Sequence, residues 1–262
     1  MKYFVLSDVH NNYNYMLTAL TEKGFDSNNE NHKIILVGDA FDKGPNPVDV
    51  YLFLKEMISK NKLIWIVGNH EFLLLKRIEE NKFNNHNDTY DTLNLLAKYN
   101  SKKEYLTDEE VLKEINKMEF KSFLLNNLLP YYETPNYVFA HGFIPTKKNT
   151  IIDNWRTLPL NSWYTATTNN GMKKVMVEGI TIPNKTLVCG HTRASYGNVR
   201  KEYDISKWND KIFDKLQKFK NNIEMFKPYI GNKVIGIDGC WRETKMVNCI
   251  IIEDWKECNN GK

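Results

Sequence analysis

Five short polar clusters, rich in carboxylate, amide and imidazole side chains, follow five apolar segments of this 262-residue chain. They are Asp8-Val9-His10, Gly38-Asp39-Ala40-Phe41-Asp42-Lys43-Gly44, Gly68-Asn69-His70-Glu71, His141-Gly142 and Gly190-His191-Thr192. Four of the six histidines of the chain belong to these clusters. Nitrogen and oxygen ligands without cysteine suit iron, manganese or zinc. The clusters therefore predict metal chemistry.

Each cluster has a simpler structural interpretation when it is considered alone. An aspartate after a strand is more often a helix N-cap than a ligand, and an isolated histidine is more often an ordinary core or surface residue. Asp8 and His10, however, are two residues apart, so on an extended strand end their side chains would point the same way. Five such clusters in one order have no good structural explanation, and we interpret them as one metal site.

The apolar segments that precede the clusters have the composition of short β-strands. They are residues 3–6, 34–37, 63–67, 137–140 and 186–189, and two more such segments follow at 234–237 and 247–252. Helical periodicity over residues 13–20 and 48–58 separates the first three. Strands that alternate with helices predict βαβ units and a parallel sheet. Ligands of such sheets bind at the carboxyl ends of the strands, where every cluster lies.

The middle of the chain has no strand pattern. Apolar residues at helical spacing predict three helices, over residues 72–78, around 93–96 and over 111–125, and a polar break lies at 84–88. We expect a helical insertion over about 72–130 and a lysine-rich surface excursion over about 194–230. No linker divides the sequence, so we expect one domain over residues 1–262.

The composition is that of a globular protein. Hydrophobic residues make up 42% and charged residues 26%, which argues against a disordered or fibrous chain. The net charge of +4 is too balanced to indicate a nucleic-acid partner. No apolar run approaches about 18–20 residues, and the first apolar run is too short for a secretory signal. We therefore expect a cytoplasmic monomer without a nucleic-acid or membrane partner.

The ordered clusters resemble the signature of the calcineurin-like metallophosphoesterases, which reads Asp-x-His, Gly-Asp-x-x-Asp-(Arg/Lys)-Gly, Gly-Asn-His-Glu, His-Gly and Gly-His-Thr. The elements GDAFDKG and GNHE are most similar to the phosphoprotein-phosphatase branch, especially its bacterial and phage serine/threonine phosphatases. The resemblance extends from Asp8 to His191. It implies an α/β fold, namely an α/β/β/α sandwich of two mixed sheets flanked by helices, with the helical insertion added.

The resemblance also implies a role for each cluster. Two divalent metal ions, most often Mn²⁺ with iron or zinc as alternatives, would share Asp39 about 3.5–4 Å apart. The implied ligands are Asp8 and His10 with Asp39 for the first ion, and Asn69, His141 and His191 with Asp39 for the second. A hydroxide between the ions would attack the phosphate. His70 would protonate the leaving oxygen as a general acid, and Asp42 would hydrogen-bond its imidazole.

The chain departs from the family pattern where phosphate should bind. Lys43 occupies the position where the family usually has arginine. Lysine keeps the positive charge but lacks the planar guanidinium group. A second arginine, usual before a Gly-Met pair, is absent before Gly171-Met172. Arg156 is our candidate for its role, with a surface salt bridge as the alternative, and Arg193 is the next candidate.

Three functions follow from this pattern. The leading one is hydrolysis of phosphate monoesters, with phosphoserine and phosphothreonine in proteins as substrates. The second is hydrolysis of a dinucleoside polyphosphate, as in the symmetrical bis(5'-nucleosyl)-tetraphosphatases. The third is a binding protein that kept the fold and lost catalysis, which the intact ligand set disfavours. The substrate, a phosphoprotein or a small phosphoester, is not decided by the sequence.

Overall fold

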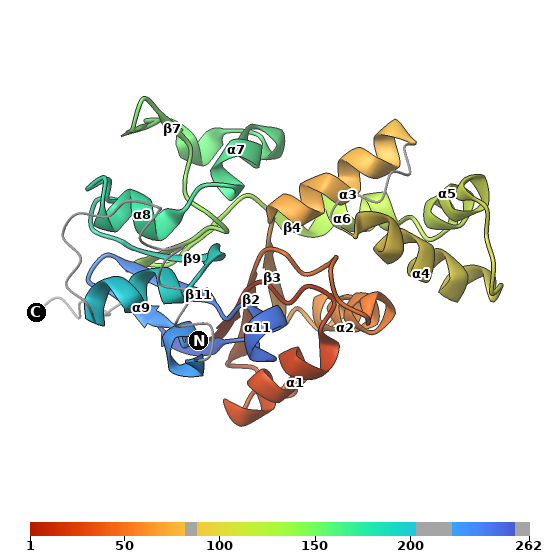
Figure 1. Cartoon of the computed structure of the whole chain (residues 1–262), viewed down its shortest axis with the longest axis horizontal. Helices are drawn as coiled ribbons and strands as arrows, with labels where there is room; N and C mark the ends of the chain where they lie inside the picture. Colours follow the sequence, from red (N-terminus) through yellow and green to blue (C-terminus); the bar gives the residue numbers. More distant parts are fainter. Residues whose placement is uncertain (82–87, 203–221, 255–262) are drawn as a thin grey trace, which may run out of the picture.

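Two mixed sheets form the centre of the computed structural model, which describes residues 1–81, 88–202 and 222–254 (Figure 1). The first sheet has the order β12-β1-β2-β3-β4. Its strands are β1 (Lys2–Leu6), β2 (His32–Val37), β3 (Leu63–Ile66), β4 (Leu128–Leu129) and β12 (Cys249–Glu253). β1 to β4 are parallel, and β12 pairs antiparallel with β1 at one edge.

The second sheet has the order β10-β11-β9-β6-β5. Its strands are β5 (Tyr132–Glu133), β6 (Tyr137–Phe139), β9 (Thr186–Arg193), β10 (Tyr229–Ile230) and β11 (Val234–Asp238). The three central strands are parallel, and the two edge strands are antiparallel to their neighbours. A separate two-residue ladder joins β7 (Thr146–Lys147) to β8 (Thr150–Ile151). All seven predicted strands are present, and the short strands β4, β5, β7, β8 and β10 were not predicted.

Alternation of side chains along the strands produces the layers. In β1, Val5 faces the second sheet and Phe4 faces the helices. In β2, Ile35 likewise faces the second sheet and Leu36 faces the helices. Successive residues of a strand point to opposite faces, so a strand that is apolar throughout can bury both. The layer between the sheets is mostly aliphatic, with Val5, Val37, Ile66, Val188, Ile235 and Ile237, and it also contains the rings of Tyr3 and Phe139. The predicted α/β/β/α sandwich is thereby confirmed.

Helices cover both outer faces of the sandwich. The first sheet carries α1 (Tyr13–Glu22) and α2 (Pro47–Ser59), which fit the predicted periodicity. The second sheet carries α8 (Gly171–Met176), and Met172 packs against Gly236 of β11. The other described helical segments after β8 are η1 (Trp155–Thr157), η2 (Leu160–Trp163), α7 (Tyr164–Thr167), α9 (Ser195–Glu202), η4 (Ile223–Phe226) and α11 (Trp241–Thr244).

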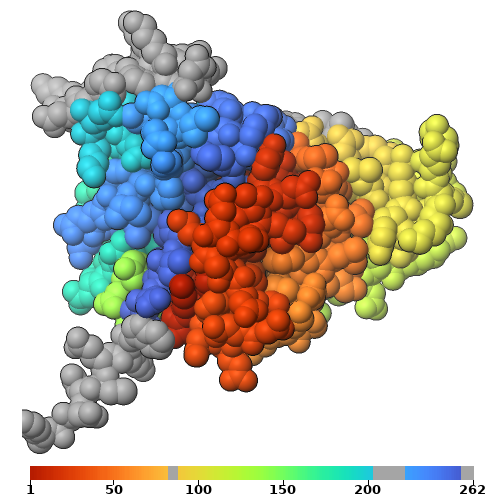
Figure 2. Space-filling model, turned by 90° about the horizontal axis from the view of Figure 1, so that it is seen from below, coloured from red at the N-terminus to blue at the C-terminus, as the bar shows by residue number. Residues whose placement is uncertain are grey.

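The helical insertion forms one end of the molecule (Figures 1 and 2). It contains α3 (Asn69–Glu80), α4 (Thr89–Ser101), α5 (Asp108–Lys117) and α6 (Phe120–Asn127). The third predicted helix is therefore two helices. The chain turns at Glu119, whose φ is +53°, and this left-handed residue ends one helix and begins the next. The insertion begins at Asn69 rather than near residue 72, so the Gly-Asn-His-Glu cluster is part of its first helix.

Parts of two other predictions lie outside the described residues. Most of the polar break at 84–88 and residues 203–221 of the predicted surface excursion belong to this group. The described parts of the excursion are α9, η4 and β10, and Tyr196 and Val199 of α9 are buried. Among the described helices, none combines the length and the apolar character needed to cross a membrane.

Candidate active site

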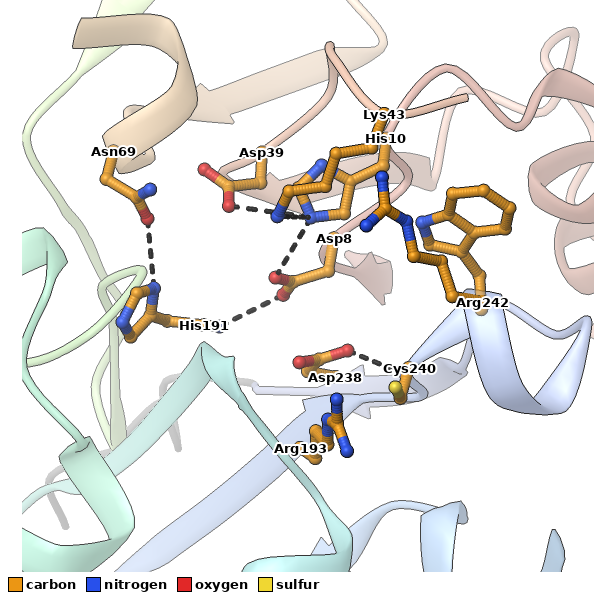
Figure 3. Close-up of a pocket in the computed structure, with 11 residues that line it drawn as sticks. Asp8, His10, Asp39, Lys43, Asn69, His191, Arg193, Asp238, Cys240 and Arg242 are labelled. Atoms are coloured by element: carbon orange, nitrogen blue, oxygen red, sulfur yellow. Dashed lines mark hydrogen bonds and ion pairs between the residues drawn. The ribbon is translucent and has the colours of Figure 1, made fainter. Parts of the chain in front are cut away.

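The five polar clusters come together as predicted, four of them after the carboxyl ends of β1, β2, β3 and β6. The Gly190-His191-Thr192 cluster was predicted to follow its strand, but it lies within the last residues of β9. Residues of four of these clusters line a pocket of about 230 Å³. The lining residues are Asp8, His10, Asp39, Lys43, Asn69, His191, Arg193, Asp238, Cys240, Trp241 and Arg242 (Figure 3). His141, the remaining predicted ligand, lies beside them with Nε2 3.3 Å from Oδ1 of Asp39.

The backbone at the site is left-handed at several residues that are not glycine. The angle φ is positive at Asp8, His10, Asp39, Asp42, Lys43 and His191. Such conformations cost on the order of 1–3 kcal/mol each and gather at functional sites, where the surroundings enforce them. The prediction that Asp8 and His10 lie on an extended strand end is wrong, because β1 ends at Leu6. The left-handed loop instead places the His10 imidazole between the carboxylates of Asp8 and Asp39.

Two glycines permit the close approach of the loops. Gly38 has φ +76°, and a Cβ there would lie 2.5 Å from Nδ1 of His141. A Cβ on Gly190 would collide with the side chains of Ser7 and Asp8. The glycines of the Gly-Asp and Gly-His clusters are thus required for the two sheets to meet at the site.

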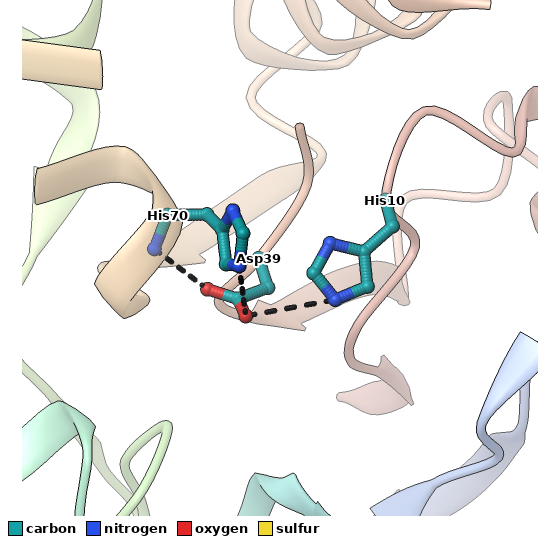
Figure 4. Close-up of side chains that lie close together, drawn as sticks. All are labelled: His10, Asp39 and His70. Atoms are coloured by element: carbon teal, nitrogen blue, oxygen red, sulfur yellow. Dashed lines mark hydrogen bonds and ion pairs between the residues drawn. The ribbon is translucent and has the colours of Figure 1, made fainter. Parts of the chain in front are cut away.

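One group of ligand atoms gathers around Oδ2 of Asp39 (Figure 4). Nδ1 of His10 lies 3.0 Å from the carbonyl oxygen of Phe41, which can only accept, so Nδ1 carries the proton. Nε2 of His10 then presents its lone pair 3.7 Å from Asp39 and 3.8 Å from Asp8. Nε2 of His70 lies 4.0 Å from the same Asp39 oxygen, so His70 is within reach of this group as well.

A second group gathers around Oδ1 of Asp39. Nδ1 of His141 lies 2.8 Å from the carbonyl oxygen of Val37, which turns its Nε2 toward Asp39. Oδ1 of Asn69 lies 3.2 Å from Nε2 of His141 and 2.9 Å from Nδ1 of His191. Asp39 therefore presents one carboxylate oxygen to each group, and it could contribute a ligand to each of two ions.

The electrostatics of the site suit cations. Burial raises the pKa of Asp8 well above its usual value, and the nearby carboxylate of Asp238 adds to the rise. Burial lowers the pKa of His10 to about 3 and that of His191 to about 4, so both imidazoles are neutral at pH 7, as metal ligands must be. The nitrogen and oxygen donors of the two groups therefore fit two divalent ions.

His141 and Asp39 form a charged pair without metal. Burial opposes the charge on His141, but the carboxylate of Asp39 outweighs it and raises the pKa of His141 to about 10. Burial would likewise raise the pKa of Asp39, but attraction to His141 and His70 holds it well below its usual value. A metal ion at this position would replace the proton that His141 carries.

The predicted Asp42–His70 pair is present and fully buried. Oδ2 of Asp42 lies 2.7 Å from Nδ1 of His70. Burial raises the pKa of Asp42, and its contacts with His70 and two threonine hydroxyls oppose that rise. Nε2 of His70 consequently faces the metal ligands rather than the protein interior.

Glu71 holds the loop of Asp39 in place, a role that the sequence analysis did not assign. Its buried carboxylate accepts from the backbone N–H groups of Gly68, Asp39 and Ala40 at 2.8–2.9 Å. Burial and the charge of Asp39 raise the pKa of Glu71 to about 7. The final residue of the Gly-Asn-His-Glu cluster thus connects the ends of β2 and β3.

Three cationic side chains line the pocket. Nζ of Lys43, a predicted phosphate-binding residue, lies 3.2 Å from Nε2 of His10. Arg193, the second predicted arginine, is also present, and its Nη1 lies 2.7 Å from Glu243. Arg242 was not predicted, and its Nη2 lies 2.9 Å from Asp88.

Arg156, the first arginine candidate, is not among the residues that line the pocket. Its guanidinium makes a two-pronged contact with Glu133, at 2.9 Å from Nε and 2.8 Å from Nη2. It also lies 4.2 Å above the ring of Trp155. The structure therefore shows the surface salt bridge that was the alternative interpretation of Arg156.

The cluster after β11 is the part of the pocket that sequence reasoning missed. The apolar run at 234–237 was predicted as a strand, and Asp238, Cys240 and Arg242 follow it as the other clusters follow their strands. The backbone N–H of Cys240 donates to Oδ1 of Asp238 at 2.7 Å. The position of these residues after a strand was the signal that could have identified them.

The fold and the site together define a class of protein. The chain belongs to the calcineurin-like phosphoesterase family, whose sequence profile matches residues 1–226. A solved protein serine/threonine phosphatase from Saccharomyces cerevisiae has the same fold with a TM-score of 0.50, at 10% identity, over 99% of this chain and 82% of that one. The predicted superfamily and fold are thereby confirmed.

Curated relatives match a shorter part of the chain. An asymmetrical bis(5'-nucleosyl)-tetraphosphatase of Bacillus velezensis is 28% identical over 76 residues, which is 27% of this chain and 30% of that protein. A symmetrical bis(5'-nucleosyl)-tetraphosphatase of Proteus mirabilis is 33% identical over 85 residues, 31% of this chain and 30% of that protein. The chain thus spans less than a third of the length of these relatives in the matched segments.

Proposed function

We propose that this protein is a dinuclear-metal-dependent phosphatase that hydrolyses phosphate monoesters, with phosphoserine and phosphothreonine in proteins as its substrates. The supporting observation is Asp39, whose two carboxylate oxygens face two separate groups of ligand atoms. Two bound divalent ions, Mn²⁺ first among them, would supply the nucleophile and offset the charge of the phosphoryl oxygens. Asp8, His10, Asn69, His141 and His191 would hold these ions together with Asp39.

His70 acts as the general acid in this proposal. Asp42 holds Nδ1, so Nε2 is the nitrogen that faces the substrate. It gives its proton to the leaving oxygen as the ester bond breaks, while Lys43 binds a phosphoryl oxygen. General acid–base catalysis contributes typically about 10²–10⁴-fold to a rate.

The test compares His70→Asn with the wild type on phenyl phosphate and p-nitrophenyl phosphate. Metal is first removed with EDTA, which should abolish activity, and Mn²⁺ should restore it better than Mg²⁺. His70→Asn should keep both metal ions and lose about 10²–10⁴-fold on phenyl phosphate. The loss should be smaller on p-nitrophenyl phosphate, because its leaving oxygen needs little protonation.

Two outcomes would contradict the proposal. Full activity of the metal-stripped protein would reject the dinuclear mechanism. Loss of one metal equivalent in His70→Asn would make His70 a ligand, which its distance of 4.0 Å from Asp39 also permits.

Hydrolysis of a dinucleoside polyphosphate is the second candidate function. It is favoured by three further residues that line the pocket, Arg193, Trp241 and Arg242. The two arginines offer positive charge for further phosphate groups, and the indole of Trp241 offers a surface on which a nucleobase could stack. It also agrees with the activities for which the two curated relatives are named. A phosphopeptide and diadenosine tetraphosphate should be assayed side by side with Mn²⁺.

A substitution of Arg242 tests the second candidate directly. If the pocket binds a polyphosphate, Arg242→Gln should raise KM for diadenosine tetraphosphate about 10-fold, since a charge-assisted contact contributes about 1.5–3 kcal/mol. KM for p-nitrophenyl phosphate should stay within about twofold. Arg156→Gln is the matched control, because Arg156 pairs with Glu133 and does not line the pocket. No turnover of diadenosine tetraphosphate by the wild type would exclude this function.

A further inference from the structure

The helical insertion reaches into the active site through two threonines of α4. Thr89 and Thr92 are buried, and both hydroxyls donate to the carboxylate of Asp42. Thr92 Oγ1 lies 2.8 Å from Oδ1, and Thr89 Oγ1 lies 3.2 Å from Oδ2. Oδ2 also contacts Nδ1 of His70 at 2.7 Å. Both oxygens of Asp42 are therefore engaged, and no solvent reaches them because Asp42 is 0% exposed.

The direction of the hydrogen bond from Thr92 is fixed by a third residue. Nδ2 of Asn11 donates to Oγ1 of Thr92 at 3.0 Å. A hydroxyl has a single proton, so Thr92 accepts from Asn11 and commits its own proton to Asp42. Asn11 follows His10, and the chain of contacts from Asn11 through Thr92 and Asp42 thus joins the first loop to His70.

The helix α4, which carries both threonines, is packed into the hydrophobic core. Thr89 and Thr92 are three residues apart and so share one face of the helix. Leu93, Leu96 and Ala97 of the same helix are fully buried in the core that α4 shares with α2, α3 and α5. The two hydroxyls therefore have little freedom to move relative to Asp42.

We propose that Thr92, assisted by Thr89, is a positioning residue that the helical insertion supplies to the Asp42–His70 pair. The two hydroxyls fix the plane of the Asp42 carboxylate, and Asp42 in turn fixes the ring of His70 so that Nε2 points at the leaving oxygen. This inference rests on the proposed role of His70 as the acid. Misplacement of a catalytic group by about 1 Å can cost about 10²-fold, so the orientation of this ring affects the rate.

The test uses Thr92→Val, which keeps the shape of the side chain and removes the hydroxyl, and Thr92→Ser, which keeps the hydroxyl. Rates are measured with Mn²⁺ on phenyl phosphate and p-nitrophenyl phosphate, and bound metal is counted by mass spectrometry. Thr92→Val should retain two metal ions and lose about 10-fold in kcat on phenyl phosphate. Its loss on p-nitrophenyl phosphate should be less than about threefold, with KM within about twofold on both, and Thr92→Ser should restore most of the rate.

Thr134→Val is the matched control. Thr134 is also a buried threonine whose hydroxyl donates to an aspartate, Asp254, but it does not line the pocket. This variant should leave the ratio of the two rates unchanged. If Thr92→Val does not fold, Thr89→Val, which removes the longer hydrogen bond, is measured instead. It must lose rate on phenyl phosphate more than on p-nitrophenyl phosphate, by a smaller factor than is expected for Thr92→Val.

Either of two results would overturn the inference. One is an unchanged rate in Thr92→Val, and the other is an equal loss on both substrates that Thr92→Ser fails to restore. His70→Asn distinguishes this failure from failure of the proposed function. If His70→Asn discriminates between the two leaving groups and Thr92→Val does not, the acid is correctly assigned and the threonine role is wrong.

Discussion

Single residues at the site have pKa values that differ from their usual ones, because burial and neighbouring charges shift them in opposite directions. His10 and His191 are neutral at pH 7, with pKa values lowered by burial to about 3 and about 4. His141 is protonated, because Asp39 raises its pKa to about 10. The two ligand groups therefore respond differently to pH, and metal binding makes this difference measurable.

Metal binding should release the proton of His141. A metal ion needs the neutral imidazole, so between pH 7 and about 10 binding should strengthen as pH rises, because fewer protons compete. Calorimetric titration with Mn²⁺ in two buffers of different ionisation enthalpy gives the number of protons released. His141→Asn should lower that number by one.

His191→Asn is the control for this titration. The imidazole of His191 is already neutral at pH 7, so its loss should weaken binding without changing the number of protons released. If the wild type and His141→Asn release the same number of protons on binding Mn²⁺, His141 is not the source of the released proton.

At the scale of the elements, the strands that follow from the hydrophobic pattern were predicted from the sequence. The helix break and the side-chain contact that depend on tertiary packing were not. The strands that precede the five clusters were predicted because they are apolar and bounded by polar residues. The break between α5 and α6 was missed, because residues 111–125 have continuous helical periodicity and Glu119 is not a breaking residue. The contact of Thr92 with Asp42 was also missed, since 50 residues separate the two.

The break at Glu119 gives a stability prediction. Glu119 is exposed and has φ +53°, a conformation that costs a non-glycine residue about 1–2 kcal/mol. Glu119→Gly should therefore stabilise the protein by about 0.5–1 kcal/mol after the entropy cost of glycine is subtracted. Urea unfolding measures the difference.

Glu119→Ala separates backbone strain from loss of the side chain. Alanine has a Cβ and keeps the strain, so this variant should show no comparable gain. A stabilisation by alanine equal to that by glycine would mean that the side chain, and not the backbone angle, is unfavourable.

For the whole molecule, the site connects the two sheets. Asp8, His10 and Asp39 follow strands of the first sheet, whereas His141 and His191 belong to the second. The backbone N–H of His191 donates to Oδ2 of Asp8 at 3.0 Å across this junction. The sequence predicted this meeting of clusters. It did not reveal the left-handed loops that produce it, because positive φ at aspartate and histidine has no sequence signal comparable to that of glycine.

Metal should therefore stabilise the entire fold. At a free Mn²⁺ concentration of 100 times Kd, binding to the native state adds about 2.7 kcal/mol, which corresponds to a rise in Tm of roughly 5–8 °C for a chain of this size. Asp39→Asn should lose this rise, because it removes charge from both groups. Arg156→Gln, which alters a surface ion pair, should retain the rise in Tm. Differential scanning calorimetry measures Tm for the wild type and both variants. An undiminished rise in Asp39→Asn would show that the ion binds elsewhere.

The positions of the ligands along the chain have a consequence for the order in which the site is completed. A ribosome adds residues from the N-terminus, and Asp8, His10 and Asp39, the proposed ligands of the first ion, are all synthesised before residue 40. The other group needs His141 and His191, and β1 acquires its neighbour β12 only from residues 249–253. A nascent chain thus contains the first set of ligands long before the second, and both sets are present only after His191 has been synthesised.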